Sequence, residues 1–165
     1  MRYNLSMMER KTKLYLDTSI INFAVDDRTP AEKLLTQNLI KEIKAGKYEV
    51  FISEVVLLEI NKSEEEKRKE LFNVLKEVNP EELDISREVR ALAEKYVVEE
   101  IIPAKHMDDA LHIAAASVND VDIVVSWNFE HIVKHKTRVA VAAINILKGY
   151  KALDICTPQE VIENV

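Results

Sequence analysis

Residues 13–23 read KLYLDTSIINF, and this stretch sets the fold that we expect. The short apolar run at 13–16 is bounded by charge, which is typical of a buried β-strand. Asp17 follows the run at once, so the strand would hold its backbone rigidly while its carboxylate projects from the strand end. Taken alone, Asp17 could equally well be a loop carboxylate or a helix cap with no functional role. Thr18 and Ser19 would orient it by hydrogen bonds or simply form a turn.

The same strand signal recurs along the chain. YEVFI (48–52) alternates like a strand, DIVVS (122–126) is a second buried run, and LDIC (153–156) is a short one. Apolar spacing and capping patterns predict helices over 30–47, 53–60, 63–78, 86–100, 108–118 and from 157 onward, with one or two helical turns at 129–135. Strands that alternate with helices predict an α/β domain with a mostly parallel central sheet.

Three of the expected helices begin with a capping pattern. Ser53 is a candidate N-cap. Ser63 with Glu66, and Thr157 with Glu160, have the spacing of a capping box. In that motif a side-chain hydroxyl and a glutamate satisfy free amides of the first turn.

Length and charge limit the class of protein. A chain of 165 residues suits one domain, which we place at 1–165 with its core at about 13–160. Acidic residues outnumber basic ones, 29 to 23, which gives a net charge of −6. A negative net charge argues against the basic surface with which a simple DNA-binding module binds nucleic acid. It permits an enzyme whose acidic residues hold cations.

Residue counts exclude several kinds of site. Cys156 is the only cysteine, so neither an internal disulfide nor a cysteine-based zinc site can form. Two glycines are too few for a phosphate-cradling loop. No apolar run approaches the roughly 18 residues of a membrane span, and residues 1–13 lack the apolar core of a secretory signal. We therefore expect a cytoplasmic protein that does not enter a membrane.

The segment HMDDALHIAAAS (106–117) places two aspartates at the start of an alanine-rich helix. The helix dipole stabilises an acid in the first turn by roughly 0.3–1 kcal/mol, which explains one aspartate better than Asp108 and Asp109 together. The alanines allow close backbone packing, so this helix should be central. His112, one turn further on, is more often a core or capping histidine than a metal ligand.

Two more polar residues stand among apolar ones. Glu59 lies in VVLLEI; if it is partly buried it needs a cation or strong hydrogen bonds, and otherwise it faces water. Asn128 follows the strand at 122–126 and fits a turn residue, an N-cap or a ligand-holding amide. Its neighbours Trp127 and Phe129 fit a core position better than a base-stacking one.

Ligands of open parallel sheets bind at the carboxyl ends of the strands. Asp17, Asn128 and the helix that holds Glu59 would meet at that edge. The side-chain oxygens of Asp17, Glu59 and Asp109, with Asp108 or Asn128 nearby, would form a metal site of the type that binds Mg²⁺ or Mn²⁺. Such a metal polarises a phosphate and lowers the pKa of a bound water.

Four segments resemble a PIN domain in their order and approximate spacing, over about residues 13–160. They are LYLDTSIINF, ISEVVLLEI, DDALHIAAAS and DIVVSWNF. The tail GYKALDICTPQEVI looks like that of PIN proteins related to VapC-type toxins. The resemblance implies a three-layer α/β/α sandwich. It also implies a metal-dependent ribonuclease that cleaves RNA, pairs as a toxin with an antitoxin protein, and forms a homodimer.

The resemblance also assigns residues. The catalytic metal ligands would be Asp17, Glu59 and Asp109, with Asp108 as a further ligand. Asn128 stands where the family commonly has a fourth aspartate, and it would orient water or a second ion. The remaining candidates would bind substrate: Ser19, Ser126, Lys134, Lys136 and Arg138. The last three belong to KHKTR, the one compact basic cluster, which contacts phosphate or is a solvated loop.

The missing charge at position 128 and the negative net charge also favour a second hypothesis. In it, the domain is a PIN-fold nucleic-acid-binding or regulatory module with weak or no catalysis. If the chain were a purely structural α/β domain, the four matching segments would have to arise by chance.

Overall fold

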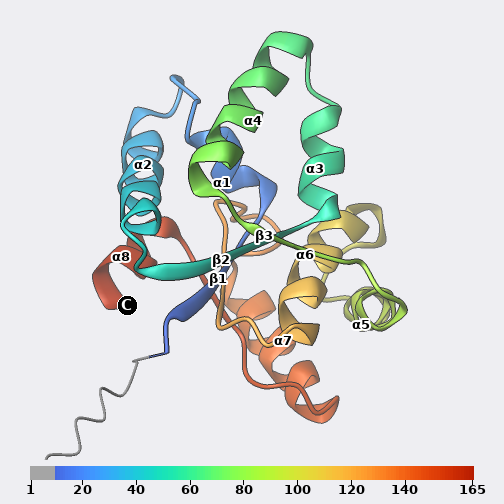
Figure 1. The fold of residues 1–165 in the computed structure, drawn as a ribbon. Helices are drawn as coiled ribbons and strands as arrows, with labels where there is room; N and C mark the ends of the chain where they lie inside the picture. Colours follow the sequence, from blue (N-terminus) through green and yellow to red (C-terminus); the bar gives the residue numbers. More distant parts are fainter. Residues whose placement is uncertain (1–9) are drawn as a thin grey trace, which may run out of the picture.

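A five-stranded sheet runs through the centre of the computed structural model, which describes residues 10–165 (Figure 1). The first nine residues of the domain predicted at 1–165 lie outside the described part. In spatial order the strands are β3 (Glu81–Leu83), β2 (Tyr48–Ser53), β1 (Thr12–Leu16), β4 (Ile123–Val125) and β5 (Asp154–Cys156). Every neighbouring pair is parallel, which confirms the predicted α/β class.

Helices connect the strands. In chain order they are α1 (Thr18–Phe23), α2 (Pro30–Lys44), α3 (Glu54–Asn61), α4 (Glu65–Val78), α5 (Arg87–Val98), the short 3₁₀ helix η1 (Ala104–His106), α6 (Met107–Val118), α7 (His135–Leu147) and α8 (Pro158–Asn164). Over residues 10–165, no helix is both long and apolar enough to cross a membrane.

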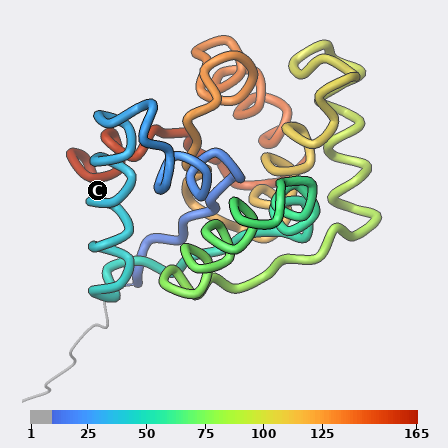
Figure 2. Tube along the Cα trace, turned by 90° about the horizontal axis from the view of Figure 1, so that it is seen from above, coloured from blue at the N-terminus to red at the C-terminus, as the bar shows by residue number. Residues whose placement is uncertain are grey.

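The helices cover both faces of the sheet, so the domain has three layers. One apolar core joins β1 and β2 to α1, α2, α4 and α8. A second core joins the opposite face of the sheet to α5, α6 and α7. Helices α2 and α8, which are far apart in the sequence, pack side by side (Figure 2). This arrangement is the predicted α/β/α sandwich.

Strand β1 lies at the centre of the sheet, and its side chains alternate between the two cores. Leu14 and Leu16 enter one core and Tyr15 enters the other, and all three are fully buried. A strand that is buried on both faces has a continuous apolar sequence instead of an alternating one. The run at 13–16 is therefore recognisable from sequence, and its end fixes the position of Asp17.

Most predicted elements are confirmed, with ends that shift by a few residues. The predicted helical turns at 129–135 are wrong, because this segment forms hydrogen-bonded turns and α7 begins only at His135. Helices α1 and α7 and strand β3 are absent from the sequence prediction.

The expected caps have mixed outcomes. Ser53 caps α3, since its hydroxyl accepts from the amide of Val55, and Thr157 forms the predicted capping box with Glu160. The capping box at Ser63 is wrong. The N-cap position of α4 is one residue later, and no side chain of the described residues caps this helix.

Candidate metal centre

Asp17 lies at the carboxyl end of β1, where its amide extends the sheet by donating to the carbonyl of Val125 (3.2 Å). It occupies the N-cap position of α1, but its side chain makes no cap hydrogen bond. The residue is only 3% exposed. The Asp17 carboxylate therefore bonds to groups other than the backbone amides of α1. The pairing of β1 with β4 fixes the position of its backbone.

Two serine hydroxyls hold the Asp17 carboxylate. Ser19 donates to Oδ1 and Ser126 donates to Oδ2, both at 2.5 Å. Each hydroxyl in turn accepts from a backbone amide, of Trp127 (2.8 Å) and of Asn128 (2.9 Å) respectively. Because a backbone amide can only donate, the hydroxyl protons are free to point at the carboxylate. We name Asp17, Ser19 and Ser126 the Asp17 clamp.

The electrostatics of Asp17 show that its charge is costly. Burial raises the pKa of this carboxyl, and the charge of Asp109 raises it further. The charge of His112 and the two serine hydroxyls oppose that rise. An ionised carboxylate in such surroundings is stabilised by any nearby cation.

Glu59, on α3, is partly buried and satisfies its expected need for hydrogen bonds. Thr18 Oγ1 donates to its Oε1 (3.0 Å), and His112 Nε2 lies 2.7 Å from the same oxygen. Burial raises the pKa of Glu59, but the hydrogen bond and charge of His112 outweigh it, so the pKa is lowered overall. Both bonds use one oxygen, so Oε2 has no hydrogen bond to the described residues.

His112 is the buried core histidine that the sequence favours. Besides Glu59, its Nδ1 lies 2.7 Å from the hydroxyl of Tyr15, which also contacts Ser53 Oγ at 2.7 Å. Burial lowers the pKa of His112, whereas the hydrogen bond to Glu59 and the charges of Asp17, Glu59 and Asp109 raise it, and the net shift is upward. The three carboxylates therefore favour the protonated form of His112.

Asp109 and Asp108 open α6 on different sides. Asp109 is half-buried; burial raises its pKa, and the charges of His112, His131 and His106 lower it. Asp108 is exposed and lines a cleft of about 470 Å³ together with Glu59. The structure thus gives the paired aspartates two different surroundings.

Asn128 acts in a turn. Its Oδ1 accepts from the amide of His131 (3.0 Å), and its carbonyl accepts from the amides of Ile132 (3.1 Å) and Val133 (2.7 Å). Hydrogen bonding by its side chain also lowers the pKa of Asp109. Of the roles that the sequence left open, turn formation is therefore observed.

The candidate substrate-binding residues are dispersed. Ser19 and Ser126 belong to the Asp17 clamp, and Ser126 is fully buried. Lys134 and Lys136 are exposed. Arg138 instead forms a two-bond ion pair with Glu160 of α8, at 3.1 Å for each bond.

The two aromatic neighbours of Asn128 differ. Trp127 is buried and donates to Thr36 Oγ1 (2.7 Å), as expected for a core residue. The core position expected for Phe129 is wrong, since its side chain is 59% exposed on the turn after β4.

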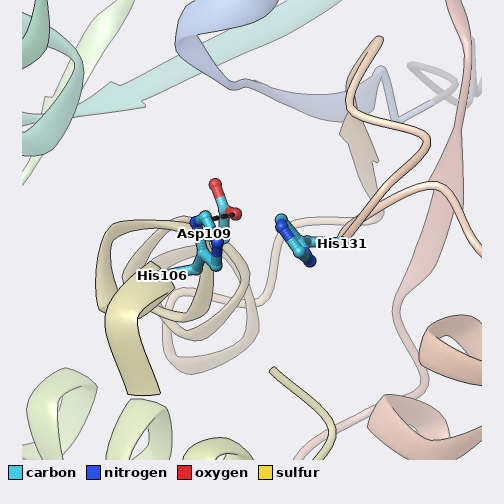
Figure 3. Close-up of side chains that lie close together, drawn as sticks. All are labelled: His106, Asp109 and His131. Atoms are coloured by element: carbon cyan, nitrogen blue, oxygen red, sulfur yellow. Dashed lines mark ion pairs between the residues drawn. The ribbon is translucent and has the colours of Figure 1, made fainter. Parts of the chain in front are cut away.

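The charges of Asp17, Glu59 and Asp109 all raise the pKa of His112, but no group of three possible metal ligands among residues 10–165 contains more than one of these carboxylates. Among residues 10–165, the one group of three possible metal ligands whose atoms all lie within 4.8 Å is His106, Asp109 and His131 (Figure 3). The sequence reasoning missed both of these histidines. The i, i+3 spacing of His106 and Asp109 at the start of a helix could have revealed the first.

No family model and no curated protein sequence matches the chain. Solved structures do match it. A chain of VapBC2 from Rickettsia felis, bound to a DNA fragment from the promoter, has a TM-score of 0.56 at 18% identity, covering 88% of this chain and 98% of that chain. A chain of the DNA-bound VapBC from Salmonella typhimurium has a TM-score of 0.53 at 17% identity, covering 89% and 98%.

A chain of VapBC-5 from Mycobacterium tuberculosis, described as a member of the VapBC family of toxin–antitoxin systems, has a TM-score of 0.51 at 14% identity, with 88% and 98% covered. At these identities the likeness is one of fold. It confirms the PIN-like, VapC-like fold that the four sequence segments predict.

Proposed function

We propose that this chain is a divalent-metal-dependent endoribonuclease and the toxin component of a toxin–antitoxin pair. The observation that carries the proposal is the Asp17 clamp. It keeps a buried carboxylate oriented at the carboxyl end of the central strand, although burial and the charge of Asp109 both disfavour its ionised form. A buried carboxylate whose pKa is shifted in this way is a candidate functional group, and a bound cation would stabilise its charge.

The ligand types present suit a hard cation such as Mg²⁺ or Mn²⁺, although the carboxylates of Asp17, Glu59 and Asp109 do not form one group within 4.8 Å. Carboxylate oxygens of Asp17, Glu59 and Asp109 and the amide of Asn128 are the ligand types that these ions prefer. An ionised carboxylate has about four lone-pair sites, so the hydroxyls on Asp17 leave further sites for a metal. When bound, such a metal would polarise the scissile phosphate and lower the pKa of a water. These carboxylates raise the pKa of His112, whose protonated form would offset part of their negative charge in the absence of a metal.

The chain's own groups would position the substrate. The cleft beside Glu59 and Asp108 is also lined by Lys62 and Arg90, which offer cations for backbone phosphates. Lys134 and Lys136 are exposed on the loop after β4 and its junction with α7. We propose these four cations as phosphate contacts. In this assignment Ser19 and Ser126 position Asp17, and Arg138 is structural.

The fold neighbours support an antitoxin partner. All three are chains of VapBC assemblies, one of which is described as belonging to a family of toxin–antitoxin systems. We propose that this chain likewise binds an antitoxin protein and forms a homodimer. Co-expression with the small open reading frame nearest its gene, followed by purification of a complex, tests the pairing.

A second candidate is a PIN-fold binding module with weak or no catalysis. The geometry of Asn128 favours it, because this residue has no charge and its Oδ1 is used by the amide of His131. A module of this kind would bind RNA without cutting it.

Cleavage of a mixed-sequence single-stranded RNA with Mn²⁺, with Mg²⁺ and with EDTA separates the two candidates. For a nuclease we expect metal-dependent cutting that Asp17→Asn and Asp109→Asn each reduce by more than the roughly 10–100-fold typical of outer-shell changes. Asp27→Asn removes the same charge at an exposed site between α1 and α2, and it should cut like the parent. RNA binding without cutting by the folded parent would support the binding module.

A further inference from the structure

Two imidazoles and a carboxylate meet where η1 leads into α6 and where the chain turns after β4. His106 and Asp109 lie one turn apart, with His106 Nδ1 3.9 Å from Asp109 Oδ2. His131 comes from the loop after β4, and its ring stacks on that of His106 with centroids 3.9 Å apart and planes at 32°. Figure 3 shows the three side chains gathered around one point from two separate segments.

Backbone hydrogen bonds hold both histidines in place. The amide of His106 donates to the carbonyl of Pro103 (2.8 Å), which closes the 3₁₀ turn. The amide of His131 donates to Asn128 Oδ1 (3.0 Å), and its carbonyl accepts from Thr137 Oγ1 (2.9 Å). The two rings are therefore positioned by the fold. Side chains supported in this way are the kind that make a precise ligand set.

The ring of His131 is under-satisfied. Its Nε2 atom is buried and has no hydrogen-bond partner among residues 10–165. A carboxylate oxygen of Glu130 lies 3.5 Å away, but in a geometry that does not form a hydrogen bond, and that side chain is 82% exposed. Buried polar atoms are nearly always paired, so an unpaired imidazole nitrogen indicates a function.

His112 provides the internal contrast. It is more deeply buried than His106 or His131, and both of its ring nitrogens contact polar groups, of Tyr15 and Glu59. A histidine that only stabilises the core is satisfied in this way. His106 and His131 instead lie against each other and a carboxylate.

We propose that His106, Asp109 and His131 form a binding site for a first-row transition-metal ion of the Zn²⁺ type. Two imidazole nitrogens and one carboxylate oxygen are a ligand set for Zn²⁺, with a fourth position left open, and a poor one for Mg²⁺. Tetrahedral Zn²⁺ ligands at about 2.0–2.1 Å stand roughly 3.4 Å from one another. The 3.9 Å between His106 Nδ1 and Asp109 Oδ2 is slightly longer, and the two stacked rings would have to rotate out of their stack for both imidazoles to point a nitrogen at one ion.

This site shares Asp109 with the proposed nuclease centre but is a different site. It draws on His106 at the end of η1 and His131 in the turn after β4, both outside the Asp17 clamp, and it selects ions through nitrogen ligands. Zinc binding here does not depend on whether the chain cleaves RNA.

Calorimetric titration of the full chain with Zn²⁺, in the absence of RNA, tests the site. We expect one Zn²⁺ per chain. His106→Ala and His131→Ala should each weaken binding by at least the roughly 10–100-fold that even outer-shell changes cause. His135→Ala is the matched control, because His135 is an exposed histidine at the start of α7 and should leave Zn²⁺ affinity unchanged. Titration with Mg²⁺ should be insensitive to all three changes.

Two outcomes would overturn the site: a folded parent that binds no Zn²⁺, or a double variant at positions 106 and 131 that binds it as the parent does. Circular dichroism verifies folding, and His106→Gln replaces the half-exposed ligand if His131→Ala does not fold. Asp17→Asn separates this inference from the nuclease proposal. It should keep Zn²⁺ binding while losing RNA cleavage; loss of Zn²⁺ binding would place the ion in the carboxylate centre instead.

Discussion

The hydroxyl of Ser126 donates to Oδ2 of Asp17 at 2.5 Å, between residues 109 positions apart in the sequence. The two residues follow the neighbouring strands β4 and β1, and the amide of Asp17 is bonded to the carbonyl of Val125. The orientation of the carboxylate is therefore set by the central pairing of the sheet.

Ser126→Ala tests this relationship. The change leaves an oxygen of Asp17 and the amide of Asn128 without their buried partner, so we expect a loss of about 1–3 kcal/mol in the free energy of unfolding. Each kcal/mol corresponds to a fall of about 2–4 °C in Tm for a domain of this size. RNA cleavage should fall with it. Ser19→Ala removes the equivalent bond at a half-buried position, and water can replace it, so its effect should be smaller. Equal stability of Ser126→Ala and the parent in thermal unfolding would contradict the clamp.

Asn128→Asp restores the acid that the PIN resemblance expects. The new carboxylate can still accept from the amide of His131, but it adds charge beside Asp109, whose pKa burial already raises. We expect a lower Tm without metal and a larger increase in Tm on adding Mn²⁺, which reflects about tenfold tighter binding, or about 1.4 kcal/mol. Asn119→Asp, an exposed change at the end of α6, should not alter the response to Mn²⁺. A response of Asn128→Asp to Mn²⁺ that matches the parent's would argue against a metal at this edge.

Tyr15→Phe tests the buried chain from Ser53 through Tyr15 to His112. Loss of the hydroxyl leaves Ser53 Oγ and His112 Nδ1 without this partner in the core, so unfolding in urea should show a cost of about 1–3 kcal/mol. Tyr48→Phe removes a hydroxyl bonded to Glu42 near the surface, where water takes its place, and it should cost less than about 1 kcal/mol. Similar losses of stability in the two variants would mean that the buried hydrogen bonds of Tyr15 contribute no more than a hydrogen bond near the surface.

The Arg138–Glu160 pair should make part of the stability pH-dependent. Burial raises the pKa of Glu160, but the hydrogen bonds from Arg138 outweigh it and lower the pKa below 4.5. A lowered carboxyl pKa adds stability above pH 4.5, and this stability is lost as the pH falls through the lowered value. Both side chains are about one-third exposed, so the contribution is at most about 1 kcal/mol.

Arg138→Ala should therefore reduce the free energy of unfolding at neutral pH, and the difference from the parent should shrink in acid. The exposed Lys136→Ala serves as the control and should not change stability. A difference between Arg138→Ala and the parent that stays constant with pH would show that the ion pair is not its source.

The helices and strands that the sequence predicts are those whose pattern of apolar residues reflects how they are buried. The central strands are apolar because both faces are covered, and α6 is alanine-rich because it packs closely. Helix α7 is missed because its buried stripe includes Thr137 and Asn145, while Ile146 and Leu147 are exposed, which inverts the usual amphipathic pattern.

The two remaining omissions have simpler causes. Strand β3 is an edge strand of three residues, and it begins with two exposed glutamates, which have low strand propensity. Helix α1 has only six residues, too few for a helical period to emerge.

The candidate site is predicted in part for the same reason. Strand ends are visible in the sequence, so the place of Asp17 at the sheet edge follows from the strand prediction. The stacking of His131 on His106 does not, because it depends on the path of an irregular turn that brings together residues 25 positions apart. The hydrogen bond by which Ser126 holds Asp17 likewise depends on side-chain directions that only the packed structure defines.

The Asp17 clamp also has a consequence for synthesis of the chain. Asp17 leaves the ribosome 109 residues before Ser126, and the amides of Trp127 and Asn128 follow directly after Ser126. A polypeptide that ends before Ser126 therefore cannot assemble this centre, even if its first strands have already folded.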